Sequence, residues 1–309
     1  MSLAFVFPGQ GSQSVGMLSE LAETYAVVKQ TYQEASDVLG YDLWKLICDG
    51  PAEELNQTHI TQPALLAAGI AVWRVWQEKG GEQPVVLAGH SLGEYTALVA
   101  SGAISFADGI ALVAERGKYM QEAVPAGEGG MAAILGLDDE KVIALCAEAA
   151  QGEVVSAVNF NSPGQVVIAG QATAVDRAIE QAKEAGAKRA LKLAVSAPSH
   201  CALMQPAAER LAEKLASIAI QTPTIPVINN ADVVAATDAD SIRDALVRQL
   251  YSPVRWVESV EKMAADGVDR LIECGPGKVL IGLNKRIVKT MSAAAIFDTA
   301  TLDAALADS

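Results

Sequence analysis

Short apolar runs and longer segments with helical periodicity alternate along the chain. Residues 3–7 and 84–88 are apolar runs of strand length followed by glycine-containing turns, as expected of strands buried on both faces of a sheet. Residues 18–38 and 61–78 are predicted helices, with Pro63 near the first turn of the second. Buried strands that alternate with helices predict an α/β fold with a mainly parallel sheet.

The same alternation of strands and helices continues in much of the remaining chain. Strands are predicted at residues 226–230 and 270–274, and helices at 41–48, 51–55, 94–101, 106–120, 201–218, 241–250 and 257–266. After residue 280 the chain is first helical and then alanine-rich, with no clear pattern.

A different pattern fills the stretch between Pro125 and Pro198. Strands are predicted at residues 130–136, 154–159, 165–169 and 187–194, and helices at 138–150 and 172–185, with a turn over 161–164. The order β-α-β-β-α-β is that of a ferredoxin-like unit. We therefore predict an inserted small domain at 126–197 within a hydrolase-like core of residues 1–125 and 198–309, with hinges at 125–127 and 196–198.

The segment Gly89-His90-Ser91-Leu92-Gly93 lies between a predicted strand and a predicted helix. A Gly-x-Ser-x-Gly turn in this context is typical of a nucleophile elbow, which holds a serine hydroxyl clear of the sheet. The helix that follows presents backbone N–H groups to a developing oxyanion. The alternative is an ordinary connection in which Ser91 caps the helix.

A serine nucleophile needs a base, and the chain has only three histidines, His59, His90 and His200. His59 has no evident link to the elbow, and the side chain of His90 should point away from that of Ser91. His200 follows the second hinge and is the best candidate, although a purely structural histidine remains the alternative. No acid follows Ser91 in the order of a hydrolase triad. We therefore expect a neutral acceptor, such as a backbone carbonyl, to orient the imidazole.

Composition narrows the possible functions. The 309 residues carry a net charge of −14, which disfavours non-specific nucleic-acid binding. No apolar run is long enough for a membrane span, no secretory signal is evident, and the four cysteines show no metal-binding spacing. The turn at residues 8–13 fits neither a P-loop nor a dinucleotide fingerprint, although its backbone could cradle an anion. We expect a cytoplasmic protein without metal or bound cofactor.

Arg116 lies beside the apolar stripe of the predicted helix 106–120. For an arginine in a helix, a solvated charge is the ordinary interpretation. Arg116 also belongs to a wider set of motifs, and this set points to a different role for it, given below. Its members, in chain order, are Phe7-Pro8-Gly9-Gln10-Gly11-Ser12-Gln13, Thr61-Gln62-Pro63-Ala64, Gly89-His90-Ser91-Leu92-Gly93-Glu94-Tyr95, Arg116-Gly117, Ser199-His200, Asn229 and Glu273-Cys274-Gly275-Pro276-Gly277.

This set, spread over nearly the whole chain, resembles the acyltransferase family of fatty-acid and polyketide synthesis, and above all its discrete bacterial members. The resemblance implies transfer of a malonyl group from malonyl-CoA to the phosphopantetheine thiol of acyl carrier protein, which supplies extender units for fatty acid synthesis. It implies Ser91 as nucleophile, His200 as base, and Arg116 as the ligand of the malonyl carboxylate. It also implies an oxyanion hole from the backbone N–H groups of Gln10 and Leu92.

Four further residues match supporting positions of that family: Gln249, which helps to orient the histidine, and Gln62, Asn161 and His90 near the pocket. Modular polyketide acyltransferases often carry a four-residue signature that ends at the catalytic histidine. Here residues 197–200 read Ala-Pro-Ser-His, which is neither of its common forms, so the assignment of malonyl as the acyl group rests on the free-standing architecture.

An acidic carrier protein needs a positive patch on this acidic chain. Two clusters qualify, one of Lys188, Arg189 and Lys192 and one of Lys285, Arg286 and Lys289, with solvated surface charge as the alternative for each. We expect a monomer. Two other functions stay open, a serine acyl hydrolase, which the missing acid and the arginine disfavour, and a non-catalytic synthase subunit, which the complete residue set disfavours.

Overall fold

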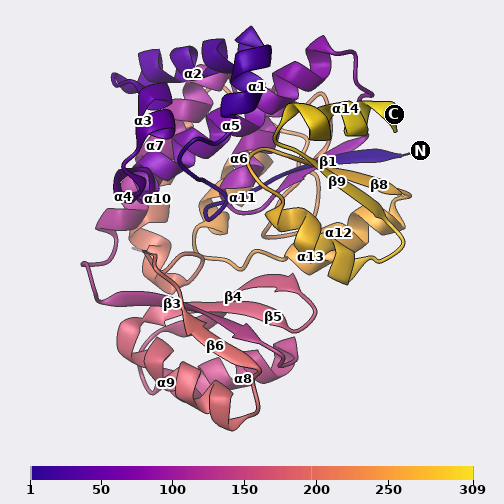
Figure 1. The fold of residues 1–309 in the computed structure, drawn as a ribbon. Coiled ribbons are helices and arrows are strands. Elements are labelled where there is room, and N and C mark those ends of the chain that lie inside the picture. The colour runs from indigo at the N-terminus through magenta and orange to yellow at the C-terminus, as the bar shows by residue number, and fades with distance from the viewer. Residues whose placement is uncertain (1, 196, 309) are drawn as a thin grey trace.

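Five parallel strands form the central sheet of the larger domain in our computed structural model, which describes residues 2–195 and 197–308 (Figure 1). The strands are β1 (Leu3–Phe7), β2 (Val86–Gly89), β7 (Val227–Ile228), β8 (Arg270–Cys274) and β9 (Ser292–Ile296), in the order β7-β2-β1-β8-β9. All five residues of β1 are buried, as the apolar run predicts. The α/β class with a parallel sheet is confirmed.

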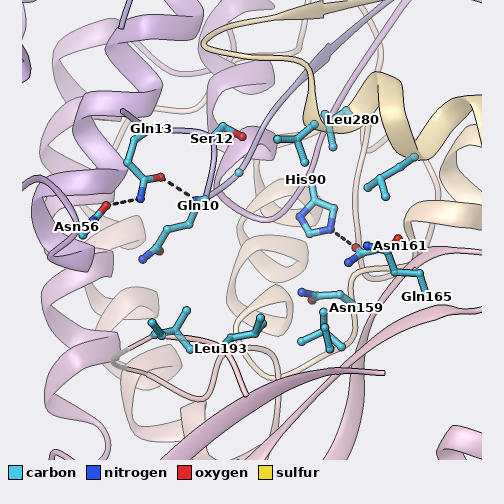
Figure 2. Close-up of a pocket in the computed structure, with 18 residues that line it drawn as sticks. Gln10, Ser12, Gln13, Asn56, His90, Asn159, Asn161, Gln165, Leu193 and Leu280 are labelled. Carbon is cyan, nitrogen blue, oxygen red and sulfur yellow. Dashed lines mark hydrogen bonds between the residues drawn. The ribbon is translucent and has the colours of Figure 1, made fainter. Parts of the chain in front are cut away.

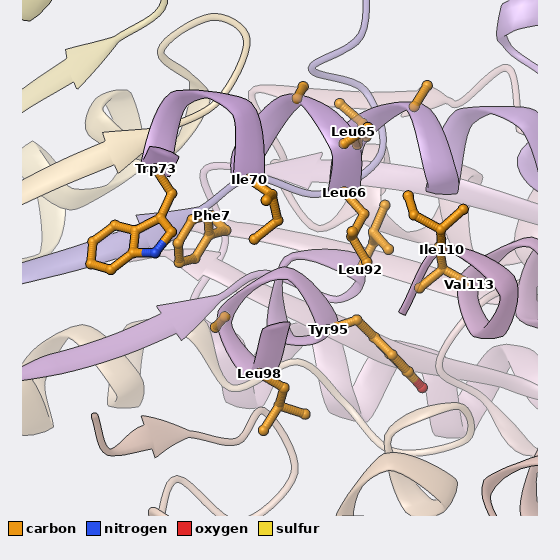
Figure 3. Packing of buried hydrophobic residues seen from close by; sticks show 14 of the residues in the cluster. Phe7, Leu65, Leu66, Ile70, Trp73, Leu92, Tyr95, Leu98, Ile110 and Val113 are labelled. Atoms are coloured by element: carbon orange, nitrogen blue, oxygen red, sulfur yellow. The ribbon is translucent and has the colours of Figure 1, made fainter. Parts of the chain in front are cut away.

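Helices cover this sheet. They are α1 (Ser19–Thr24), α2 (Ala26–Leu39), α3 (Leu43–Asp49), α4 (Ala52–Leu55), α5 (Thr58–Glu78), α6 (Leu92–Ala100), α7 (Phe106–Glu122), α10 (Gln205–Ala216), α11 (Ala239–Gln249), α12 (Trp256–Ala265), α13 (Val279–Ile287) and α14 (Thr299–Ala307), with a 3₁₀ turn at Ala202–Met204. Figure 3 shows Leu66, Ile70 and Trp73 of α5 gathered with Phe7 of β1 and Leu92 of α6 in the apolar core.

The inserted unit forms a separate sheet in the lower part of Figure 1. Its elements are β3 (Gly129–Leu135), α8 (Asp139–Ala150), β4 (Val155–Ser162), β5 (Gln165–Gln171), α9 (Ala172–Glu184) and β6 (Arg189–Lys192). The antiparallel order β4-β5-β3-β6 confirms the predicted ferredoxin-like pattern. The domain limits stay a prediction, and Ser196 of the second hinge lies outside the described residues.

The small domain is attached to the core beside the end of α11. The Phe160 backbone N–H donates to the Val254 carbonyl oxygen at 3.0 Å, and the Val254 N–H donates to the Val158 oxygen at 2.8 Å. A small apolar cluster also joins Met131 and Val158 of the small domain to Cys201 of the core. These contacts hold the small sheet next to Cys201 and Val254.

Several predicted boundaries are wrong. Residues 18–38 form two helices, because Tyr25 adopts an extended conformation between them. The helix expected from Thr61 begins at Thr58, so Pro63 lies inside it rather than in its first turn. Asn161 and Ser162 end strand β4 instead of forming a turn. The helix expected from Cys201 begins with a 3₁₀ turn, and the alanine-rich tail adds β9 and α14.

Two glycines allow α6 to cross β1 and β2 at very short range. A Cβ added at Gly89 would lie 1.9 Å from the Gly93 carbonyl carbon, and one added at Gly93 would lie 2.0 Å from the Phe7 carbonyl oxygen. Because both contacts are with backbone, no side-chain rotation can relieve them. The Gly-x-Ser-x-Gly spacing is therefore a packing requirement of this turn.

We predict that Gly93→Ala lowers the free energy of unfolding by at least about 2 kcal/mol in urea denaturation, because the new methyl group overlaps the Phe7 carbonyl. Gly282→Ala is the matched control. Gly282 lies in α13, and an added Cβ there meets no described atom outside its own helix within 4 Å. Its alanine variant should be unchanged or more stable by up to about 1 kcal/mol. Equal stabilities for the two variants would contradict the packing argument.

Candidate active site

Ser91 lies in the sharp turn between β2 and α6. Its backbone has φ 51° and ψ −107°, a conformation that L residues rarely adopt. Asn230 stabilises the turn from the neighbouring loop: its Oδ1 accepts from the Ser91 backbone N–H at 2.7 Å, and its Nδ2 donates to the Gly89 carbonyl at 2.7 Å. The geometry is that of the predicted elbow, and the helix-cap alternative fails because Ser91 makes no side-chain cap bond.

The imidazole ring of His200 lies next to the Ser91 hydroxyl. Its Nε2 lies 2.8 Å from Ser91 Oγ, and its Nδ1 lies 2.8 Å from the Gln249 backbone oxygen. A carbonyl oxygen only accepts, so Nδ1 carries the proton and Nε2 is free to accept the serine proton. The expected neutral acceptor is therefore present, and no carboxylate in the described chain is hydrogen-bonded to the ring.

The surroundings of His200 favour its neutral form. The side chain is 3% exposed, and its burial, followed by the positive charge of Arg116, lowers its pKa to about 3. The hydrogen bond to Gln249 opposes this shift but does not cancel it. A neutral imidazole with a free Nε2 is the form that a general base requires.

Arg116 is buried, so the solvated-charge interpretation is wrong. Its side chain is 1% exposed and its guanidinium lies 5.0 Å from the centre of the Tyr95 ring. Nη1 donates to Gln62 Oε1 at 2.9 Å, and Nη2 donates to Gln249 Oε1 at 3.0 Å and lies 3.4 Å from Ser91 Oγ. In the described structure no carboxylate pairs with this cation, and Nε has no hydrogen-bond partner.

The two predicted oxyanion donors are the backbone N–H groups of Leu92 and Gln10. Leu92 is the first residue of α6, so its backbone N–H is one of the unpaired donors of a helix start. Gln10 lines the same pocket as Ser91 and His200, and its side chain donates to Thr58 Oγ1 at 3.1 Å. Both N–H groups remain predicted oxyanion ligands.

A larger cavity of about 590 Å³ adjoins the pocket around Ser91 and shares Gln10, His90 and Asn159 with it. Figure 2 shows amide side chains, including those of Gln10, Asn159 and Asn161, around this cavity. The Nε2 of His90 lies 2.8 Å from Asn161 Oδ1, so its ring joins the core to the small domain. Neither His90 nor Asn161 is hydrogen-bonded to Ser91 or His200 in the described structure. His59 instead approaches Gln121, with Nδ1 2.7 Å from Oε1.

Two residues of the site were not predicted. Asn229 belongs to the motif set, but its neighbour Asn230 reaches Ser91, while Asn229 bonds within its own loop. Glu94 is buried behind the elbow, and burial raises its pKa to about 7. Its place directly after the Gly-x-Ser-x-Gly motif was visible in the sequence, but its partners were not.

The fold and this site define an α/β enzyme of the serine acyl-transfer class. Residues 4–303 match the family model described as acyl transferase domain, and the chain belongs to this family. It is 64% identical over 303 residues to the malonyl CoA-acyl carrier protein transacylase of Salmonella typhimurium, with 98% of each chain covered. It is 48% identical over 305 residues to the Bacillus subtilis protein of the same name, with 98% and 96% covered.

Solved structures agree with this assignment. An acyl carrier protein S-malonyltransferase from Vibrio cholerae is 68% identical, with a TM-score of 0.96 over 98% of this chain and 99% of that chain. A malonyl-transacylase solved in complex with a type II PKS acyl-carrier protein is 61% identical, with a TM-score of 0.99 over the full length of both chains. Within the described residues, no helix is long and apolar enough to cross a membrane.

We predict that His200 stays neutral, with its proton on Nδ1, from pH 8 down to pH 5. Burial and Arg116 depress its pKa far below the usual 6.5, so the ring gains no proton in this range. Nitrogen chemical shifts of ¹⁵N-histidine-labelled protein report both the protonation state and the tautomer. Only three histidines contribute signals, and His200→Asn identifies the relevant pair. A titration midpoint near 6.5 for these signals would contradict the prediction.

Proposed function

We propose that this chain transfers a malonyl group from malonyl-CoA to the phosphopantetheine thiol of acyl carrier protein through a malonyl-Ser91 intermediate, and so supplies extender units for fatty acid synthesis. The observation that carries the proposal is Arg116, a buried cation 3.4 Å from Ser91 Oγ without a carboxylate partner in the described structure. A substrate acyl group with a free carboxylate supplies that partner. An arginine can hold it by two parallel hydrogen bonds.

In the first half-reaction, Ser91 Oγ attacks the thioester carbonyl while His200 Nε2 takes the hydroxyl proton. The backbone N–H groups of Gln10 and Leu92 stabilise the tetrahedral oxyanion, and each such donor typically contributes about 3 kcal/mol. As the carbon–sulfur bond breaks, His200 returns its proton to the thiolate of coenzyme A. The Gln249 carbonyl keeps the ring in the correct tautomer through both transfers.

The second half-reaction runs the same steps in reverse with a new thiol. His200 accepts the proton of the phosphopantetheine thiol, whose sulfur attacks the malonyl-Ser91 ester. Collapse of the tetrahedral intermediate releases Ser91 Oγ, which recovers the proton from His200. The carboxylate stays on Arg116 throughout, so the acyl group keeps one orientation in both halves.

The basic cluster of Lys285, Arg286 and Lys289 is the better candidate for docking the carrier protein. Arg286 donates to Gln165 Oε1 at 3.1 Å, and Gln165 lines the cavity that adjoins the active site. In the other cluster, Lys192 already pairs with Asp176 at 2.7 Å. We assign the carrier surface to α13 and the adjacent cavity wall.

We predict that Arg116→Ala lowers kcat/KM for malonyl transfer at least 100-fold, since the substrate carboxylate loses its cation. Acetyl transfer, which has no carboxylate to bind, should fall far less or rise. Purified protein is mixed with malonyl-CoA or acetyl-CoA, and the acyl adduct is followed by mass spectrometry. Malonyl transfer at the wild-type rate would overturn the role of Arg116.

The same assay tests the nucleophile. A malonyl adduct of the wild-type protein should be absent from Ser91→Ala, and an adduct elsewhere in the chain would contradict the assignment of Ser91. Release of free malonate, without transfer when carrier protein is added, would instead identify a hydrolase.

We predict that Arg286→Glu raises KM for the carrier protein by five- to tenfold at low salt and leaves formation of the malonyl-Ser91 adduct unchanged. Charge reversal removes a favourable long-range attraction that salt screens, so the effect should shrink as ionic strength rises. Arg189→Glu on the other cluster is the matched control and should have little effect. A larger increase in KM for Arg189→Glu than for Arg286→Glu would instead assign the carrier surface to the small domain.

A further inference from the structure

Glu94 is a buried carboxylate behind the active site. It lies in the first turn of α6, three residues after Ser91, and is 1% exposed. Its Oε2 accepts from Gln249 Nε2 at 2.8 Å and from the Asn230 backbone N–H at 2.8 Å. In the described structure Glu94 forms no ion pair.

Both partners of Glu94 hold the reacting groups. Asn230 binds the Ser91 backbone N–H through its Oδ1. Gln249 holds His200 through its backbone oxygen and Arg116 through its side-chain Oε1, and its Nε2 also donates to the Ser91 carbonyl at 3.0 Å. One carboxylate oxygen thus connects the two residues that position the nucleophile, the base and the carboxylate ligand.

The acceptor oxygen of Glu94 determines which way the Gln249 amide faces. With the NH2 group on the carboxylate, the amide oxygen faces the Arg116 guanidinium. A flipped amide would place its NH2 group against the N–H groups of Arg116 and its oxygen against Glu94, so hydrogen bonds on both sides would be lost.

The Gln249 amide keeps Glu94 and Arg116 apart. A direct salt bridge would occupy the guanidinium and compete with a substrate carboxylate. Through the amide, Glu94 orients the arginine without blocking it. The other charged or titratable groups near this carboxylate are Tyr95 of α6 and Asp232 of the loop after β7. Arg116 is therefore the cation that Glu94 faces.

We propose that Glu94 is a positioning residue for acyl selectivity: through the Gln249 amide it fixes Arg116 in the orientation that receives a carboxylated acyl group. This inference rests on the proposed malonyl transfer and adds to it the residue that sets how strongly malonyl is preferred over acyl groups without a carboxylate. Glu94 itself does not touch the substrate.

The test is a competition between equal concentrations of malonyl-CoA and acetyl-CoA, with the adducts on Ser91 read by mass spectrometry. Glu94→Ala removes the acceptor, and the malonyl-to-acetyl ratio should fall at least tenfold. Glu94→Asp keeps the charge but is one methylene too short to reach both donors, and should lower the ratio at least threefold. Glu94→Gln keeps an acceptor oxygen in place and should restore the ratio to within threefold of wild type.

Glu273→Ala is the matched control. Glu273 is also a fully buried glutamate that accepts from a backbone N–H, that of Ile281 at 2.9 Å, and in the described structure it has no hydrogen bond to Arg116, Gln249 or Asn230. Its variant should lower the melting temperature and leave the acyl ratio unchanged. Melting curves of all variants identify those that fold.

A wild-type ratio in folded Glu94→Ala overturns the inference, and so does a parallel loss of both adducts, which indicates a purely structural role. If Glu94→Ala does not fold, a wild-type ratio in Glu94→Asp has the same consequence. These results leave the proposed function standing as long as the wild-type protein forms the malonyl adduct. A wild-type protein that forms no malonyl adduct overturns the proposed function as well.

Discussion

The close crossing of α6 over β1 is the constraint on which the site depends. Because Gly93 brings the helix backbone against the Phe7 carbonyl, the chain must reverse direction within the residues between β2 and α6. Ser91 then takes a positive φ and its hydroxyl faces the pocket. An unfavourable conformation of this kind persists only when its surroundings hold it, and the bonds of Asn230 to the turn supply that support.

Burial favours both roles that we propose, His200 as the base and Arg116 as the residue that selects a carboxylated acyl group. Removing His200 from water favours its neutral form, and the neighbouring charge of Arg116 acts in the same direction. Burial of Arg116 itself is costly, because its guanidinium donates to amide oxygens rather than to a carboxylate. In the proposed reaction the substrate carboxylate supplies the missing negative charge. A carboxylate next to His200 would instead raise the pKa of this proposed base and compete for Arg116, so the neutral Gln249 carbonyl suits both proposed roles.

The sequence could predict those features of the fold and the site that are encoded by residues close together in the chain. The elbow, the buried strands and the β-α-β-β-α-β order depend on residues close together in the chain, and all are observed. The absence of a triad acid was likewise visible in the sequence. It led to the prediction that a neutral acceptor, such as a backbone carbonyl, orients the imidazole. Strand β9 was not predicted because its alanines are half-buried at the sheet edge and show no alternation. Periodicity placed Arg116 only beside an apolar stripe, so its burial needed the resemblance or the structure.

The contacts that complete the site join distant parts of the chain, and no pattern in the sequence encodes them. Asn230 is 139 residues from Ser91, and Gln249 is 155 residues from Glu94. The inserted domain contacts one of these segments. It separates Ser91 from His200 along the chain, yet its strand β4 pairs with Val254 just beyond Gln249. The insertion that lines the larger cavity thereby also pairs with the segment just after Gln249, whose carbonyl accepts from His200, so it links the cavity wall to the surroundings of His200.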